Sequence, residues 1–219
     1  KGVYVHSNGK TVQLVHANQM KGDAEQVLQI DNGLFITTKR GFYTLEKKGL
    51  KAVKEFENDI EITQILELPS FLILLTNKGN FQYSFQSKRI IPLNNWIKGN
   101  NAFVERLRFG SVDGQKITMV TDLLDQWLEI VISDKGAIYS ITKQPKTTNL
   151  TENNKIIAAT FDKTESKMVF LTKQNDLYIY HKKQLKKITK NYDKEFTGCT
   201  KLITDINGDI WLASVSYGL

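Results

Sequence analysis

One short phrase recurs along this sequence and restricts its fold more than any other feature. Each copy joins an apolar, strand-like run and a hydroxyl residue to a polar turn and then to a second strand-like run. The hydroxyl residues fall at intervals of 38, 57, 39 and 42 residues, at Thr38, Thr76, Ser133, Thr172 and Ser214. A period near 40 residues built from short strands predicts an all-β fold. Specifically, it predicts a β-propeller with one four-stranded antiparallel blade per repeat.

The repeat also predicts where each blade begins and ends. Whole blades are expected over approximately residues 24–56, 60–94, 102–150 and 155–190, in a single propeller domain or fragment that spans 1–219. The second strand of each blade is almost entirely apolar, which indicates burial on both faces between neighbouring blades. The turn after it carries glycine or asparagine, residues that adopt positive φ at little cost, at Gly41, Gly79, Gly136 and Asn175.

The two ends of the sequence contain complementary half-blades. Residues 1–16 resemble a third and a fourth strand, and residues 199–219 resemble a first and a second strand. Together they predict a composite blade that closes a ring of about five blades. The alternative is an arc of a larger, seven-bladed ring. We favour closure because an arc leaves open sheet edges and exposed apolar faces.

The 57-residue interval suggests an insertion at about residues 94–115, with Trp96 inside it. Part of the stretch 102–109 is expected to form a short helix or an extra strand. The sequence does not define the role of this insertion.

Composition excludes several kinds of site. A single cysteine, Cys199, excludes an intrachain disulfide framework and a multi-cysteine zinc site, and the three histidines have no metal-ligand spacing. We therefore expect no metal and no cofactor.

The net charge of +7 favours anionic partners. The lysines are dispersed, however, and no nucleic-acid-binding motif accompanies them, so we expect a solvated surface and no nucleic-acid partner.

Three basic residues precede the aligned turn position, namely Arg40, Lys78 and Lys135. Propeller symmetry would place them around one face, where a ring of cations can bind an acidic sugar or a carboxylate. The alternative is that they are simply solvated turn residues. Trp96 is a second binding candidate because an aromatic ring can stack on a sugar or a protein partner, although it can equally anchor its own loop. Trp127 and Trp211 are expected to pack between blades.

Catalytic signatures are sparse. Two groups of acidic residues could supply a pair of carboxyl groups for glycoside hydrolysis, which requires a separation of about 5 to 10 Å. We interpret both groups as solvated strand ends and expect a protein that is not an enzyme, with a polysaccharide hydrolase or lyase as the alternative. The groups are Asp122, Asp125 and Glu129, and Glu57, Asp59 and Glu61.

The last repeat carries the most specific motif. Asp205 is followed by a turn with Asn207 and Gly208, then by Trp211 and, at the end of the sequence, by Gly218 and Leu219. This pattern resembles the two-component regulator propeller repeat, in which the aspartate and turn precede an Ile-Trp-Ile-Gly-Thr strand and a Gly-Leu. Ala213 and Ser214 stand in place of the glycine and threonine, and residues 31–38 are a weaker second copy with Phe35 in place of the tryptophan.

The resemblance implies a sensor or ligand-binding module of a bacterial hybrid histidine kinase or a related transcriptional regulator. Many relatives respond to polysaccharide fragments and lie in the periplasm or outside the cell. The implied partners are a small molecule, an oligosaccharide or a protein on the loop face. Membrane attachment would come only through flanking segments, and the full-length protein could be a homodimer. The alternative is an interaction scaffold in secretion or surface assembly.

Overall fold

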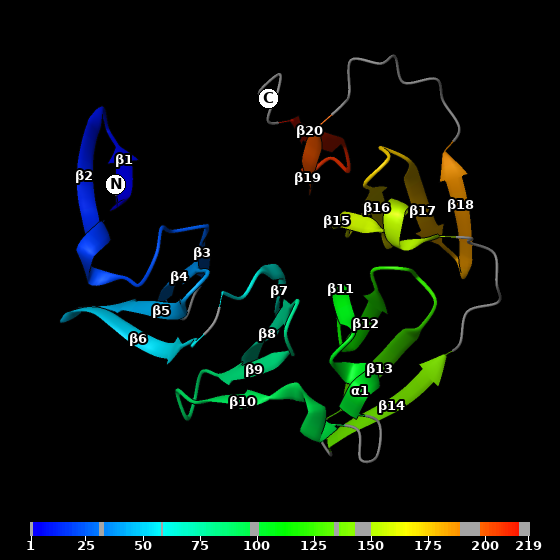
Figure 1. Cartoon of the computed structure of the whole chain (residues 1–219), viewed down its shortest axis with the longest axis horizontal. Helices are drawn as coiled ribbons and strands as arrows, with labels where there is room; N and C mark the ends of the chain where they lie inside the picture. Colours follow the sequence, from blue (N-terminus) through cyan, green and yellow to red (C-terminus); the bar gives the residue numbers. More distant parts are fainter. Residues whose placement is uncertain are drawn as a thin grey trace. The chain divides into compact units, whose positions relative to one another are not determined.

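The computed structural model describes residues 2–30, 33–57, 59–96, 101–133, 136–142, 150–188 and 198–214. It consists of two compact units, Lys1–Glu105 and Arg106–Leu219 (Figure 1). Antiparallel sheets make up both units, which confirms the all-β prediction.

The first unit contains three sheets. A two-stranded sheet pairs β1 (Gly2–Ser7) with β2 (Lys10–His16), and a 3-10 turn, η1 (Ala17–Gln19), follows it. Two four-stranded sheets come next, with strands in sequential order. Their strands are β3 (Gln26–Ile30), β4 (Gly33–Thr38), β5 (Gly41–Glu46), β6 (Gly49–Glu55), β7 (Ile62–Glu67), β8 (Phe71–Thr76), β9 (Phe81–Ser84) and β10 (Ile90–Pro92). The unit ends with η2 (Leu93–Trp96) and the short helix α1 (Asn101–Val104).

The second unit has the same organisation in the opposite order, with two four-stranded sheets before a two-stranded one. The first sheet contains β11 (Leu107–Asp113), β12 (Lys116–Thr121), β13 (Trp127–Ser133) and β14 (Gly136–Thr142). After η3 (Glu152–Asn154), the second contains β15 (Ile156–Asp162), β16 (Lys167–Thr172), β17 (Leu177–His181) and β18 (Gln184–Ile188). The last pairs β19 (Cys199–Thr204) with β20 (Ile210–Ser214).

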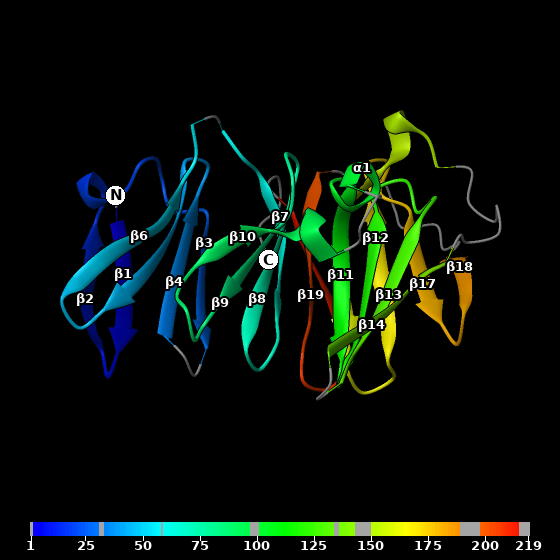
Figure 2. The same cartoon turned by 90° about the horizontal axis from the view of Figure 1, so that it is seen from below.

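Sequential antiparallel order gives every four-stranded sheet two distinct ends (Figure 2). The turns that join the second and third strands lie at one end, and we call them the middle turns: β4–β5, β8–β9, β12–β13 and β16–β17. The turns that join the third strand to the fourth lie at the opposite end, and we call them the outer turns: β5–β6, β9–β10, β13–β14 and β17–β18.

Within each unit the sheets bury one another's faces. In the first unit Phe35 and Phe42 stack with ring centroids 5.6 Å apart and pack against Leu72, Leu74 and Tyr83 of the next sheet. The face-to-face burial explains why the second strands are apolar throughout.

The second unit is built in the same way. Trp127 of β13 contacts Phe170 of β16, and Leu171 of the same β16 packs with Cys199 and Leu202 of β19. Cys199 is buried as a small apolar group, and its burial raises the pKa of the thiol.

One assignment from the repeat is wrong. Ser133 ends β13, the third strand of its sheet, whereas the second strand, β12, ends at Thr121. The repeat was misaligned because the turn after Thr121 has neither glycine nor asparagine. Instead, Leu124 adopts the left-handed conformation there, with φ of 55°. The stretch 94–115 consequently includes the start of a regular sheet, since β11 begins at Leu107 after the short helix.

Two different requirements explain the glycine or asparagine at the aligned turn position. Gly79 and Asn175 adopt positive φ, 98° and 64°, as expected. Gly41 does not, but a Cβ at Gly41 would lie 2.6 Å from the ring of Tyr43, so the close approach of this ring requires glycine.

The two tryptophans expected between sheets have different environments. Trp127 is 1% exposed, which confirms the prediction, whereas Trp211 is 56% exposed, so its assignment to the core is wrong. Trp211 pairs across the sheet with Ile203 on the face of β19–β20 opposite to the buried Cys199 and Leu202. The aromatic position of the repeat therefore points away from the neighbouring sheet that the structure describes.

The composite blade stays a prediction, as do the blade boundaries and the number of blades. The structure describes residues 2–16 and 199–214 as separate two-stranded sheets in different units.

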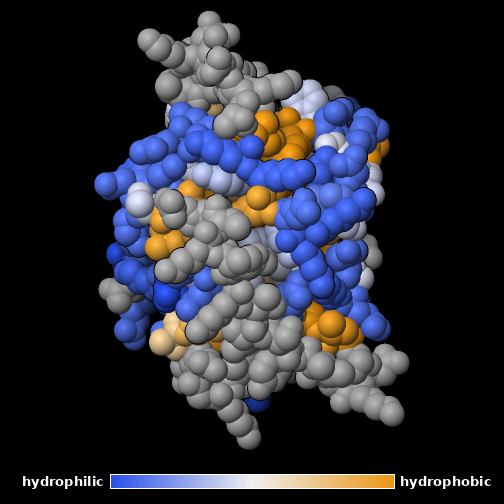
Figure 3. All heavy atoms as spheres, turned by 90° about the vertical axis from the view of Figure 1, so that its right-hand side faces the viewer, coloured by the Kyte–Doolittle hydropathy of each residue, from blue (hydrophilic) through white to orange (hydrophobic). Residues whose placement is uncertain are grey.

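The surface on the side of β14 and β18 is largely hydrophilic, with separate hydrophobic areas (Figure 3). Among the described residues, no helix has the length and apolar composition needed to cross a bilayer.

Candidate functional site

A buried threonine at the end of each second strand fixes the middle turns. Thr38 Oγ1 accepts a hydrogen bond from the N–H of Arg40 at 3.0 Å and donates one to the carbonyl of Lys21 at 2.6 Å. Thr76 Oγ1 accepts from the N–H of Lys78 at 3.1 Å and donates to the carbonyl of Gly79. The repeated hydroxyl is thus a structural group that satisfies buried turn atoms.

The same device recurs in the second unit. Thr172 Oγ1 accepts a hydrogen bond from the N–H of Asp176 at 3.1 Å, and Thr121 Oγ1 donates to the carboxylate of Asp125. Both hydroxyl residues are fully buried, as are their two equivalents in the first unit. The middle turns are therefore rigid platforms that hold the side chains following each threonine.

Arg40, the first predicted site residue, lies in the β4–β5 middle turn. Its guanidinium forms an ion pair with Asp59 and donates a hydrogen bond to the carbonyl of Glu57 at 2.9 Å. The adjoining backbone binds the same segment, because the N–H of Ile60 donates to the carbonyl of Lys39 at 2.8 Å. Arg40 thus binds the segment between β6 and β7, and the carboxylate of Asp59 neutralises its charge.

Lys78 occupies the corresponding place in the β8–β9 middle turn. Its side chain is exposed, and within the described part of the chain it has no ion pair. Of the two predicted cations that the structure describes, Arg40 and Lys78, Lys78 is therefore the one whose charge is available to a ligand.

The other two predicted site residues are not in comparable positions. Lys135 lies outside the described residues, and in the sequence it follows β13, which is the third strand of its sheet. Its expected alignment with Arg40 and Lys78 is wrong, because β13 is a third strand. Trp96 ends η2, and its side chain lies outside the described residues.

The structure pairs four of the six candidate catalytic acids with bases. Asp125 contacts Arg106 at 3.0 Å, Asp122 contacts Lys155 at 3.4 Å, and Glu129 contacts Lys116 at 2.9 Å, while Asp59 pairs with Arg40 in the first unit. Burial opposes ionisation of Asp125, but hydrogen bonds from Thr121 and Arg106 outweigh it and lower the pKa. A general acid needs a raised pKa, so this environment favours a structural carboxylate.

A pair of aspartate turns was only half recognised from the sequence. The Asp205 carboxylate accepts hydrogen bonds from the N–H groups of Asn207 at 2.9 Å and Asp209 at 3.0 Å, and from the indole N–H of Trp211 at 3.0 Å. The indole bond, followed by the backbone bonds, lowers the pKa of Asp205. This bond also explains why the Trp211 ring can keep a fixed position while exposed.

Asp162 occupies the same position in the preceding sheet. It is 1% exposed, accepts from the N–H and hydroxyl of Thr164 at 2.8 and 2.6 Å, and forms an ion pair with Lys167 at 3.1 Å. The Thr164 hydroxyl is the main cause that lowers its pKa to about 2. The sequence does contain a signal for both turns, because each aspartate has the same spacing to the strand that follows. Asp162 precedes Met168, and Asp205 precedes Trp211, by six residues, and Met168 and Trp211 are the second residues of β16 and β20.

Comparison with known proteins shows the fold. No family model matches the chain, and no curated protein matches it in sequence. Among solved structures, it is similar to the β-propeller domain of Swd1 (Cps50) from Myceliophteria thermophila, with a TM-score of 0.55 and 12% identity over 89% of this chain and 63% of that one. The chain therefore has the β-propeller fold that the repeat predicted.

Two bacterial structures are also similar. The extracellular domain described as that of a hybrid two-component system from B. thetaiotaomicron matches 100% of this chain, with a TM-score of 0.59 and 15% identity. PorZ, a surface component of the type-IX secretion system of Porphyromonas gingivalis, matches 93% of it, with a TM-score of 0.52 and 8% identity. The chain spans 35% of the first structure and 26% of the second.

Proposed function

We propose that this chain is a non-catalytic binding module of a bacterial signalling protein and that it acts outside the cytoplasm. The observation that carries the proposal is the similarity in fold, over the whole chain, to the extracellular domain of a hybrid two-component system. The two-component regulator propeller motif at Asp205 to Trp211 supports the same assignment.

The middle turns of the first unit, β4–β5 and β8–β9, are the proposed ligand-binding face. Buried threonines hold both turns, and ion pairs neutralise Lys39 and Arg40. A rigid, polar surface with balanced charge suits an oligosaccharide, whose hydroxyl groups exchange hydrogen bonds with such side chains. Lys78 would add one charge-assisted hydrogen bond to that ligand.

The test is a panel of neutral and acidic oligosaccharides, measured by isothermal titration calorimetry together with analysis of the sugar after incubation. We expect binding of at least one member with no cleavage, and weaker binding for Lys78→Gln than for the matched surface variant Lys54→Gln. Release of shortened products would contradict a non-catalytic module. Equal affinity of the two variants would remove Lys78 from the site.

An interaction scaffold is the second candidate, and the similarity to PorZ favours it. A scaffold would bind no member of the sugar panel. It would instead retain a defined protein when it is purified from the membrane fraction of its own cells, and Arg40→Gln together with Lys78→Gln would abolish that retention.

A further inference from the structure

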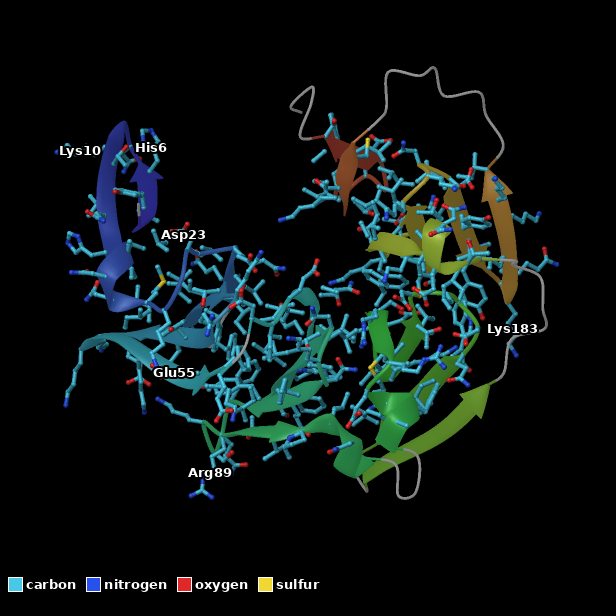
Figure 4. All side chains as sticks on the ribbon, viewed as in Figure 1. His6, Lys10, Asp23, Glu55, Arg89 and Lys183 are labelled. Atoms are coloured by element: carbon cyan, nitrogen blue, oxygen red, sulfur yellow. The ribbon has the colours of Figure 1, made fainter. Side chains whose placement is uncertain are left out.

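Three of the four outer turns carry a pair of adjacent basic residues. Among the middle turns only β4–β5 carries such a pair, Lys39 and Arg40, and both of these bases form ion pairs. The β5–β6 turn has Lys47 and Lys48, and the β9–β10 turn has Lys88 and Arg89. In the second unit the β17–β18 turn has Lys182 and Lys183, both with positive φ. Figure 4 shows Arg89 and Lys183 pointing away from the ribbon, each at the outer turn of its own unit.

The two outer turns of the first unit lie next to each other. Lys88 Nζ of the β9–β10 turn contacts Glu46 Oε1, the last residue of β5, at 2.9 Å. The hydrogen bond and charge of Lys88, followed by the charges of Lys51 and Lys48, lower the pKa of Glu46. Two neighbouring sheets therefore bring their basic turns together around one carboxylate. We call Lys47, Lys48, Lys51, Lys88 and Arg89 the outer basic patch.

The charge of this patch is not balanced. All five basic residues are exposed, and among the described residues Glu46 is the one carboxylate that forms an ion pair with any of them. The opposite end of the same sheets differs, because three of its bases are each paired with an acid: Lys21 with Glu55, Lys39 with Glu25, and Arg40 with Asp59. Lys78 is the exposed base of the middle turns there that has no ion pair among the described residues. Uncompensated positive charge is thus concentrated at one end of the unit, where it attracts anions.

The aromatic residues of the same hairpins face inward. Tyr83 of β9 is 3% exposed and packs on Phe35 and Phe42, and in the second unit Tyr180 of β17 stacks on Trp127 at 4.3 Å. Single-stranded nucleic acid is bound through exposed rings on which bases stack, and membrane surfaces through apolar side chains beside the basic ones. The lysine-rich hairpin tips offer charge without an exposed ring, and among the described residues of these hairpins Ile91 is the one large apolar side chain that is exposed, which suits a flexible polyanion.

We infer that the outer basic patch binds an acidic polysaccharide, a linear chain that carries carboxylate or sulfate groups. A basic pair at each of the two neighbouring outer turns of the first unit matches a polymer with repeated charges better than a single small ligand. The inference goes beyond the proposed function, because it concerns the opposite end of the sheets and different residues.

The test compares dextran sulfate with neutral dextran, binding each to the full chain at about 50 mM and about 300 mM salt, a range over which counterion release changes affinity strongly. We expect binding of dextran sulfate only, and weakening at the higher salt. The variant Lys47→Gln/Lys48→Gln/Arg89→Gln should lose about tenfold in affinity or more. The control Lys54→Gln/Lys163→Gln/Lys201→Gln removes the same charge from exposed positions elsewhere and should lose less than about threefold.

A second variant should move the affinity in the opposite direction. Glu46→Gln removes the carboxylate at the centre of the patch and releases Lys88, so it should bind dextran sulfate about twofold to threefold more tightly at the lower salt. Because Glu46→Gln also raises the net charge by one, a gain supports the patch when the triple patch variant also loses more affinity than its control.

Three results would overturn the inference. Equal losses in the patch and control variants would show attraction by net charge alone. Binding of duplex DNA as tight as that of dextran sulfate would assign the patch to nucleic acid, and tight binding of phosphatidylglycerol vesicles would assign it to a membrane. The oligosaccharide test uses Lys78 at the middle turns, so failure of either experiment leaves the other proposal standing.

Discussion

The middle turns and the outer turns are two ends of the same sheets, yet they are built in different ways. Buried threonine hydroxyls hold the middle turns, and carboxylates neutralise the adjacent bases, as at Arg40 and Asp59. The outer turns of the first unit are exposed, and their basic residues share the single carboxylate of Glu46. In the first unit the middle end is thus stabilised by internal contacts, with Lys78 as its one unpaired turn base among the described residues, and the outer end carries most of the charge that is available to a partner.

This difference indicates that, within one repeat, the residues that stabilise the fold and the residues that are available for binding can lie at opposite ends of the sheet. Each hairpin must satisfy its backbone, and at the middle end the sequence does this with buried side chains whose removal leaves unpaired polar groups. At the outer end the β9–β10 turn is held by exposed hydrogen bonds, such as the one from the N–H of Ser87 to Ser84 Oγ, so side chains there are free to vary in charge. Substitutions at the two ends should therefore affect different measurements.

The largest difference in the free energy of unfolding is expected between variants of Trp127 and Trp211, which bind turns at opposite ends of the sheets. Trp127 is buried and its indole donates to the carbonyl of Leu124 in a middle turn at 3.2 Å, so Trp127→Ala should lower the free energy of unfolding by about 3–5 kcal/mol. Trp211, which supports a turn at the other end, is more than half exposed, and Trp211→Ala should cost about 1 kcal/mol or less. Urea denaturation checks both values, and equal losses would contradict the difference between the ends.

A smaller effect is expected at a threonine. Thr76→Val keeps the shape of the buried side chain but leaves the N–H of Lys78 and the carbonyl of Gly79 without this partner, at a cost of about 1–3 kcal/mol. Its control at the outer end is Ser84→Ala, which removes a 3.2 Å hydrogen bond from the exposed N–H of Ser87 and should cost less than about 0.5 kcal/mol. The comparison fails if the serine variant loses as much stability as the threonine variant.

The buried Asp162 predicts how stability depends on pH. Its pKa is about 2 in the folded protein, below the ordinary 3.8 of the unfolded chain, so the unfolded chain takes up the proton first as the pH falls. The stabilisation is complete above about pH 4 and is lost toward pH 2. Asp162→Asn should be less stable at neutral pH and should lose less stability between pH 4 and pH 2, measured by urea midpoints. A parallel decline in both proteins would contradict the assigned pKa.

The smallest effect concerns the two candidate cations of the middle turns. Arg40→Gln breaks an exposed ion pair and a backbone hydrogen bond and should cost at most about 1 kcal/mol. Lys78→Gln should leave the free energy of unfolding unchanged, because the structure gives its side chain no ion pair among the described residues. A destabilised Lys78→Gln would show that this lysine has a structural role.

Sheet architecture could be predicted from the sequence because it depends on local patterns. The apolar second strands, the hydroxyl residues at Thr38, Thr76 and Thr172, and the turn at Asn175 all agree with the structure. The prediction failed at Thr121, where the left-handed residue is Leu124 and no glycine marks the turn.

The candidate site was less predictable because it depends on contacts between distant segments. Arg40 and Asp59, and likewise Glu46 and Lys88, meet only after separate strands have paired and packed. Trp211 was misassigned for a related reason, since its hydrogen bond to Asp205 and the face it occupies depend on the turn geometry and on the neighbouring sheet. Spacing in the sequence identified the turns, but not which of their charges are balanced.

The most direct test of the difference between the two ends is to map bound dextran sulfate by the chemical shifts of backbone amides in the isotopically labelled full chain. The account predicts that shifts change at Lys47, Lys48 and Arg89 as the polymer is added, while those of Lys39 and Arg40 stay constant. Changes concentrated at Lys39 and Arg40 would contradict it.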